Sequence, residues 1–174
     1  MTPDIILRTV FPSEMPAFRR RMQSTFTNAA REAFPDFAKV IPYDRDIDET
    51  LTAKGAQALQ FEWGGQLVGG AIVTGDGDRM TLEFIFIDTA CQGRHLGYAA
   101  WQAIEAYYPH ATHWELVTPY YERRNIHFYV NRCGFRITEY FNEHYADPSY
   151  PRDEAGNYPD EEGGLFKFEK EIAR

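Results

Sequence analysis

Residues 82–99 are predicted to form a strand, a glycine-bearing loop and the start of a helix, and this segment is the most informative part of the chain. It reads Leu82-Glu83-Phe84-Ile85-Phe86-Ile87-Asp88-Thr89-Ala90-Cys91-Gln92-Gly93-Arg94-His95-Leu96-Gly97-Tyr98-Ala99. The apolar run over residues 82–87 predicts a strand that ends at the turn residues Asp88 and Thr89. Apolar residues at three- and four-residue spacings up to Tyr107 then predict a helix.

The loop between this strand and this helix suits an anionic ligand. The first N–H groups of a helix have no partner within it, and the helix dipole adds positive potential at the same point. Gly93 and Gly97 allow a close backbone approach that a side chain would block. We therefore expect a phosphate or pyrophosphate group to bind at this loop.

Two common phosphate-binding loops do not fit these residues. A Walker loop needs Lys and then Ser or Thr after its last glycine, but Tyr98 follows Gly97. A dinucleotide fingerprint needs its first glycine directly after the first strand of a βαβ unit. The segment 87–97 instead resembles the acetyl-CoA loop of the GNAT N-acetyltransferase superfamily, written Gln or Arg, two residues, Gly, one residue, then Gly or Ala. Gln92 and Gly97 match this pattern, whereas His95 stands where the middle glycine is expected.

A second motif lies downstream. Residues 125–132 are compatible with a helix, and Gly134 follows at the position of a left-handed C-cap. Phe128-Tyr129 and then Gly134-Phe135 resemble the second signature of the same family, Phe or Leu, Tyr, three residues, Gly, Phe. Four residues separate Tyr129 from Gly134 here, which we interpret as one extra residue at the end of the helix.

Composition indicates one globular domain over residues 1–174. Hydrophobic residues make up 44% of the chain and aromatic residues 16%, which is enough for a sizeable core. Cys91 and Cys133 fit neither a metal motif nor a disulfide framework, so we expect no metal and a reducing, cytoplasmic setting. No apolar run approaches the roughly 18 residues of a membrane span, and a net charge of −8 argues against nucleic acid as a partner.

The negative charge is concentrated between residues 142 and 164. This segment carries seven acids and one arginine, which accounts for −6 of the net charge of −8, and it holds three prolines. Such a composition predicts a long loop between two strands. Two interpretations remain open, a solvated excursion that favours solubility and an acidic wall that attracts a cationic amine.

The remaining patterns complete an α/β fold. Further strands are expected over residues 5–10, 58–63, 66–74, 114–118, 135–141 and 165–172, and further helices from Ser13 to about Phe34 and over residues 46–54. Gly64-Gly65 predicts a type I′ or II′ hairpin turn, and Gly69 and Gly70 indicate a close backbone approach or a bulge. The order of these elements is similar to that of the GNAT family, which implies a twisted mixed sheet of about seven strands flanked by helices on both faces.

The resemblance also implies roles for individual residues. In the family an amine attacks the thioester of acetyl-CoA directly, without a covalent enzyme intermediate. Tyr129 corresponds to the general-acid tyrosine, and Glu83 to a glutamate that acts as base through water, with Glu115 as the alternative. The cofactor-binding residues implied are Phe86, Ile87, Gln92, Gly93, Arg94, His95, Leu96, Gly97, Tyr98, Ala99 and Asn125.

The function expected from this resemblance is an acetyl-CoA-dependent N-acetyltransferase. It would move an acetyl group to a primary amine, with a small molecule as the partner, without a metal and away from membranes. Two alternatives stay open, an acetyltransferase of peptide or protein amines and a non-catalytic sensor that binds acyl-CoA. A homodimer is compatible with the resemblance, because many family members pair through their sheets or C-terminal strands.

Overall fold

The computed structural model describes residues 1–148 and 164–173, and the chain forms two compact units. The N-terminal unit comprises Met1–Ala111 and the C-terminal unit Thr112–Arg174. The expectation of a single domain over residues 1–174 stays a prediction. Of the predicted acidic segment 142–164, residues 149–163 lie outside the described residues.

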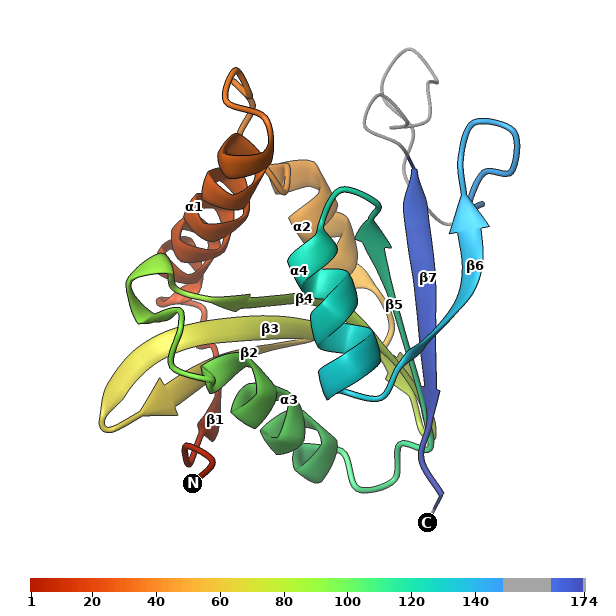
Figure 1. Cartoon of the computed structure of the whole chain (residues 1–174). Coiled ribbons are helices and arrows are strands. Elements are labelled where there is room, and N and C mark those ends of the chain that lie inside the picture. The colour runs from red at the N-terminus through yellow and green to blue at the C-terminus, as the bar shows by residue number, and fades with distance from the viewer. Residues whose placement is uncertain (149–163, 174) are drawn as a thin grey trace. The chain divides into compact units, whose positions relative to one another are not determined.

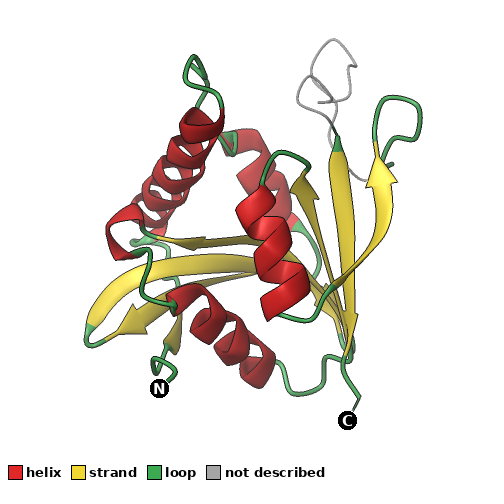
Figure 2. Ribbon diagram, in the orientation of Figure 1, coloured by secondary structure: helices red, strands yellow, loops and turns green. Residues whose placement is uncertain are grey.

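The predicted order of strands and helices is confirmed (Figure 2). In the N-terminal unit it is β1 (Ile6–Thr9), α1 (Met15–Ala33), α2 (Asp44–Thr52), β2 (Gln57–Trp63), β3 (Gln66–Asp76), β4 (Arg79–Ile87), a 3₁₀ turn η1 (Thr89–Cys91) and α3 (Leu96–Tyr107). The C-terminal unit has β5 (His113–Pro119), α4 (Arg123–His127), a π-helical segment η2 (Phe128–Arg132), β6 (Arg136–Phe141) and β7 (Leu165–Glu171). The seven strands and four α-helices of the described residues give the mixed α/β class that the sequence predicts.

Element boundaries differ from the expected ones by a few residues. Ser13 does not cap α1, because Glu14 holds the N-cap position and makes no side-chain cap bond. The Glu14 carboxylate instead accepts a hydrogen bond from the backbone N–H of Phe11 at 3.0 Å. Within the described ranges, no helix has the length and the apolar character that crossing a membrane requires.

The strands of the N-terminal unit are antiparallel and follow the order β1-β2-β3-β4. Gly64 and Gly65 join β2 to β3 with φ values of 58° and 78°, as a type I′ turn requires. Within this unit α1 and α2 lie on one side of β2, β3 and β4, and α3 lies on the other (Figure 1). Helices therefore flank both faces of these strands.

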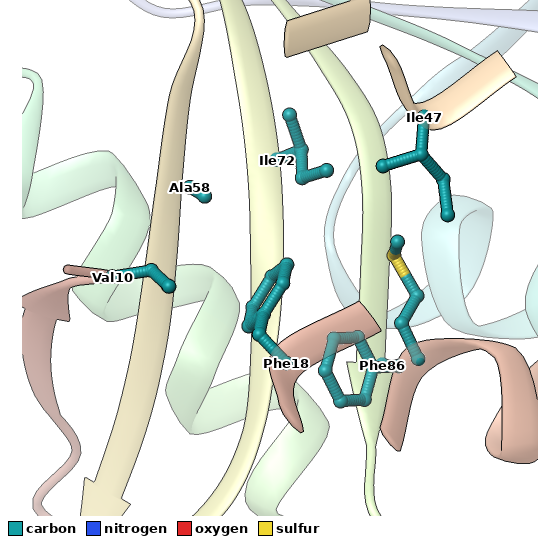
Figure 3. Packing of buried hydrophobic residues seen from close by; sticks show 7 residues of the cluster. Val10, Phe18, Ile47, Ala58, Ile72 and Phe86 are labelled. Atoms are coloured by element: carbon teal, nitrogen blue, oxygen red, sulfur yellow. The ribbon is translucent and has the colours of Figure 1, made fainter. Parts of the chain in front are cut away.

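The core between α1, α2 and the strands holds a cluster of buried apolar side chains (Figure 3). Its labelled members are Val10, Phe18, Ile47, Ala58, Ile72 and Phe86. The ring of Phe18 meets that of Phe86 edge-on at a centroid distance of 5.5 Å. This contact fixes α1 against Phe86, the penultimate residue of β4.

The close approach indicated by Gly69 and Gly70 is present. A Cβ on Gly70 would collide with the Phe18 ring and lie 2.8 Å from the carbonyl oxygen of Leu59, and one on Gly69 would collide with the Phe86 carbonyl oxygen. These two glycines therefore let α1 and β4 pack directly on the β3 backbone.

The C-terminal unit has an antiparallel sheet with the order β5-β7-β6. One face of this sheet is apolar, with Trp114 and Phe168 fully buried. The ring of Tyr129, from η2, packs on Phe168 at a centroid distance of 5.6 Å. The segment that carries Tyr129 is thus held on the apolar face of β7.

Candidate active site

Strand β4 and the loop that follows it carry most of the predicted cofactor-binding residues on one continuous segment. The backbones of Phe86 and Ile87 pair with β3 opposite Gly70 and Gly69. The Phe86 side chain is buried and that of Ile87 half-buried. The Phe86 side chain therefore belongs to the hydrophobic core, and the predicted contact of these two residues with the cofactor would be made by their backbone.

Glu83, the predicted base, occupies a β-bulge in β4. The register passes from Ile72 opposite Phe84 to Val73 opposite Leu82, so Glu83 is the extra residue of the longer strand. Its side chain is exposed and accepts a hydrogen bond of 2.6 Å from the Thr74 hydroxyl. A bulge re-aims a side chain relative to the regular alternation and is common beside active sites. The sequence gives no signal for this bulge.

The loop begins at an ion pair that the sequence analysis did not identify. Arg21 of α1 donates from Nε to both carboxylate oxygens of Asp88, at 3.2 and 3.1 Å, and from Nη2 to one of them at 2.7 Å. The same guanidinium lies 5.8 Å from the centroid of the Phe86 ring and 3.4 Å from Oε1 of the buried Gln60. Arg21 thus ties the end of β4 to α1. The sequence held one signal for this ion pair: Arg21 is a charged residue three positions after the buried Phe18, on the inner side of the helix.

The loop backbone takes left-handed conformations at two positions before α3. Gly93 has φ 79° and His95 has φ 60° and ψ 16°. His95 is the N-cap of α3 and the only described non-glycine residue with positive φ. The conformation explains why the resembled pattern has glycine here, since a side chain in this region costs free energy. It also shows that this loop accommodates histidine.

The start of α3 presents backbone N–H groups toward the loop. The first helical hydrogen bond runs from the N–H of Ala99 to the carbonyl of His95 at 3.5 Å, so the N–H groups of Leu96, Gly97 and Tyr98 precede it. A Cβ on Gly93 would meet nothing within 4 Å. The backbone of this segment therefore has the donors and the space that a diphosphate needs.

The side chains of this segment divide into two groups. Those of Gln92, Arg94 and His95 are exposed, whereas Leu96 and Ala99 are buried in the core. Gln92 donates a hydrogen bond to the carbonyl oxygen of Ile87 at 3.1 Å, which closes the loop on the strand end. Only the backbone of Leu96 and Ala99 is therefore available to a ligand.

Tyr129, the predicted general acid, is buried in the C-terminal unit at 6% exposure. Its ring packs against Phe128, Phe135 and Phe168. Burial, with smaller contributions from Cys133 and Glu122, raises the pKa of Tyr129 far above that of an ordinary phenol. The hydroxyl consequently keeps its proton at every physiological pH.

The extra residue before Gly134 is accommodated by a π turn. The N–H of Cys133 donates to the carbonyl of Phe128, five residues earlier, at 3.0 Å. Gly134 then adopts φ 80°, as the C-cap prediction requires. The inserted residue therefore widens the last turn of the helix without removing Tyr129 from the apolar face. Single π turns are often found at functional sites.

Asn125 and Glu115 are the other predicted site residues of the C-terminal unit. Asn125 is half-buried on α4, one turn before Tyr129. Glu115, the alternative base, lies on β5 with its carboxylate 3.6 Å from Nζ of Lys167. This carboxylate is therefore already engaged by an ammonium group. Glu83 and the loop residues belong to the N-terminal unit.

Comparison with known proteins gives a consistent result. The family model described as the acetyltransferase (GNAT) family matches residues 23–135. The uncharacterized protein YrkN of Bacillus subtilis (strain 168) is 39% identical over 153 residues, which cover 86% of this chain and 83% of that protein.

Two solved structures illustrate the likeness in fold. The ribosomal-protein-S18-alanine N-acetyltransferase of Escherichia coli has a TM-score of 0.68 at 14% identity, covering 98% of this chain and 95% of its own. A GNAT family acetyltransferase of Elizabethkingia anophelis, crystallised with acetyl-CoA bound, has the same TM-score and identity and covers 97% and 99%. At such low identity these structures establish the fold alone.

Proposed function

The chain belongs to the acetyltransferase (GNAT) family, as its two motifs predicted, and from this we propose that it is an acetyl-CoA-dependent N-acetyltransferase acting on the primary amine of a small molecule. The observation that carries the proposal is the backbone of the segment from Gln92 to Ala99. Left-handed residues at Gly93 and His95 turn it into the start of α3, where a diphosphate would be bound. The Elizabethkingia anophelis protein of the same fold binds acetyl-CoA, which supports this ligand.

The reaction needs the amine to lose a proton and the thiolate to gain one. The amine nitrogen forms a bond to the acetyl carbon, and the carbon–sulfur bond breaks. We propose that Glu83, fixed by Thr74, receives the proton of the amine through water. The hydroxyl of Tyr129 supplies a hydrogen bond, and then its proton, to the departing sulfur.

The raised pKa of Tyr129 has a consequence for this step. A thiol has an ordinary pKa of about 8.5, well below that of this phenol, so complete transfer from a resting tyrosine is uphill. The proton therefore moves only as the negative charge develops on sulfur, and the hydrogen bond from Tyr129 stabilises that charge before the proton is transferred.

The net charge of the chain, −8, favours a cationic amine as the acceptor.

Acylation of a peptide or protein amine is the second candidate. The Escherichia coli structure of the same fold is, by its name, an N-acetyltransferase for an alanine of a ribosomal protein. A panel of acceptors separates this candidate from the first, and it also separates both from a sensor that binds acyl-CoA without turnover.

The experiment is calorimetric titration with acetyl-CoA followed by thiol release across polyamines, aminoglycosides, amino acids and N-terminal peptides. Tyr129→Phe should lower kcat by about 100-fold or more, the usual contribution of a general acid. Tyr145→Phe, at an exposed tyrosine, is the matched control and should leave kcat unchanged. Binding without turnover of any acceptor would favour the sensor, and absence of binding would refute the proposal.

A further inference from the structure

The sheet of the C-terminal unit carries a cluster of charged side chains on the face opposite to its apolar one. Strand β5 carries His113 and Glu115, and strand β7 carries Lys167 and Glu169, each pair two residues apart and thus on one face. The two strands lie side by side in the sheet (Figure 1). Glu115 lies directly opposite Glu169 in the antiparallel register. The cluster is built entirely from residues of this unit and is independent of the proposed acetyl transfer.

Two features of this cluster favour a cation in addition to Lys167. Like charges directly opposite each other on neighbouring strands destabilise a sheet, yet Glu115 and Glu169 are paired in this way. The buried His113, at 9% exposure, points its Nε2 at them, 3.2 Å from Glu169 Oε1 and 3.9 Å from Glu115 Oε2. Its contact with Glu169 at 3.2 Å is within ion-pair distance, but no described residue gives this Nε2 a well-formed hydrogen bond. A buried nitrogen without a well-formed hydrogen bond is costly, so its orientation toward the two carboxylates needs an explanation.

We propose that His113 Nε2 and one carboxylate oxygen each of Glu115 and Glu169 bind a divalent transition-metal ion. The three ligand atoms lie within 4.8 Å of one another. Tetrahedral zinc with bonds of about 2.0–2.1 Å places its ligand atoms roughly 3.3 Å apart. The imidazole–carboxylate distances of 3.2 and 3.9 Å are therefore near those of a bound state.

The chemistry of the three ligands limits the choice of metal. One imidazole with two carboxylates suits zinc, iron, cobalt or nickel, whereas magnesium and calcium prefer oxygen ligands alone. Three protein ligands leave one position for water. The Thr138 hydroxyl hydrogen-bonds Glu169 from β6 and orients this carboxylate, as partners of metal ligands commonly do.

Lys167 is the competing cation of this cluster. Its Nζ lies 3.6 Å from Glu115, 3.9 Å from Glu169 and 3.6 Å from Glu139. Three carboxylates and one ammonium leave a charge of −2, which matches a divalent ion. The flexible lysine stem can keep its ion pair with Glu139 while a metal takes the other two carboxylates. Removal of this ammonium should therefore strengthen metal binding.

The test is titration of the full, metal-free chain with Zn²⁺ by calorimetry, repeated with Co²⁺ for its visible spectrum and with Mg²⁺ for specificity. We expect one Zn²⁺ per chain, a four-coordinate Co²⁺ spectrum and no competition by Mg²⁺. Glu115→Gln and His113→Asn should each weaken Zn²⁺ binding by at least about tenfold. Loss of a residue that only hydrogen-bonds a metal ligand already costs about that much, and these two residues are proposed as ligands themselves. Lys167→Met should strengthen it several-fold. Circular dichroism verifies that each variant is folded. If His113→Asn does not fold, Glu115→Gln still tests the proposal, because Glu115 is only half-buried.

His144→Ala is the matched control, because His144 is exposed beside Glu143 and lies outside the cluster. Its Zn²⁺ affinity should equal that of the wild type. The proposal is overturned if the wild type does not bind Zn²⁺, or if Glu115→Gln binds it as tightly as the wild type. Binding by Lys167→Met but not by the wild type would also overturn it, because the ammonium would then be the native cation.

Discussion

Replacing Arg21 by methionine should loosen the start of the loop for which we propose acetyl-CoA binding. The change keeps much of the apolar stem and removes three hydrogen bonds to Asp88, together with the contact to Gln60. The Asp88 carboxylate, which is largely buried, is then left without its cation. Because Asp88 is the first residue after β4, the loop that follows becomes less ordered before it binds a ligand.

The size of the effect follows from the exposure of the two side chains, 24% for Arg21 and 22% for Asp88. An exposed ion pair contributes about 0–1 kcal/mol, and a hydrogen bond to a charged group about 1.5–3 kcal/mol. A bidentate pair that is three-quarters buried lies between these limits, at about 1–2 kcal/mol. The guanidinium over the Phe86 ring adds about 0.5 kcal/mol. We expect Arg21→Met to lower the free energy of unfolding by about 2 kcal/mol.

The assay is a double-mutant cycle of Arg21→Met and Asp88→Asn in urea unfolding, with the Kd for acetyl-CoA measured on each variant. The coupling free energy should be about 1–2 kcal/mol. The Kd should rise about three- to tenfold in both single variants, the equivalent of roughly 0.7–1.4 kcal/mol. Arg20→Met, at an exposed neighbour on α1, should stay within about 0.5 kcal/mol of the wild type. Additivity within about 0.3 kcal/mol would refute the role assigned to the pair.

Three further changes test the fold around the site. His95→Val should destabilise the chain by about 1–2 kcal/mol relative to His95→Asn, since asparagine tolerates the left-handed conformation at φ 60° and a β-branched residue does not; equal unfolding free energies in urea would contradict this. Gly70→Ala should cost about 1–3 kcal/mol in the same assay, because its Cβ would collide with the Phe18 ring, and an unchanged midpoint would argue against that packing. Burial raises the pKa of Tyr108 to about 12, so the free energy of unfolding should fall as pH rises from about 10, where the unfolded phenol ionises, to about 12. Tyr108→Phe should remove part of that slope in unfolding measured at each pH, and an unaltered slope would count against the shift.

Local sequence signals were sufficient for the elements and for the loop of the candidate site. The hairpin turn at Gly64-Gly65 has the positive φ values that a type I′ turn demands, and these depend on two adjacent residues only. The apolar spacing predicted for the helix after the loop likewise agrees with the buried side of α3, where Ala100, Trp101 and Ile104 lie. The backbone path from β4 to α3 followed for the same reason, since turn and helix-start residues act over one or two turns of chain.

Features that depend on pairing between distant segments could not be predicted in this way. The alternation along β4 contains nothing that distinguishes a regular strand from one with a bulge at Glu83, because the bulge is defined by the register with β3. The ion pair of Arg21 with Asp88 joins residues of α1 and of the loop, which only the packing of α1 on β4 brings together. In the sequence, an ion pair of this kind is indicated only by a charged residue on the otherwise apolar side of a helix.

The extra residue before Gly134 illustrates the boundary between the two kinds of feature. Counting residues shows that one is inserted, but an insertion can lengthen a helix, loosen a turn or widen a helical turn, and each outcome points Tyr129 differently. The hydrogen bond from Cys133 to Phe128 shows that the turn is widened. Tertiary packing determines which of these outcomes occurs. Tyr129 and Phe135, on either side of the insertion, lie in the same apolar cluster, with their rings 5.8 Å apart. A π turn keeps both rings in that cluster, whereas one more α-helical residue would rotate one of them by about 100° away from it. The core of the C-terminal unit, rather than the local sequence, therefore sets the direction of the proposed general acid.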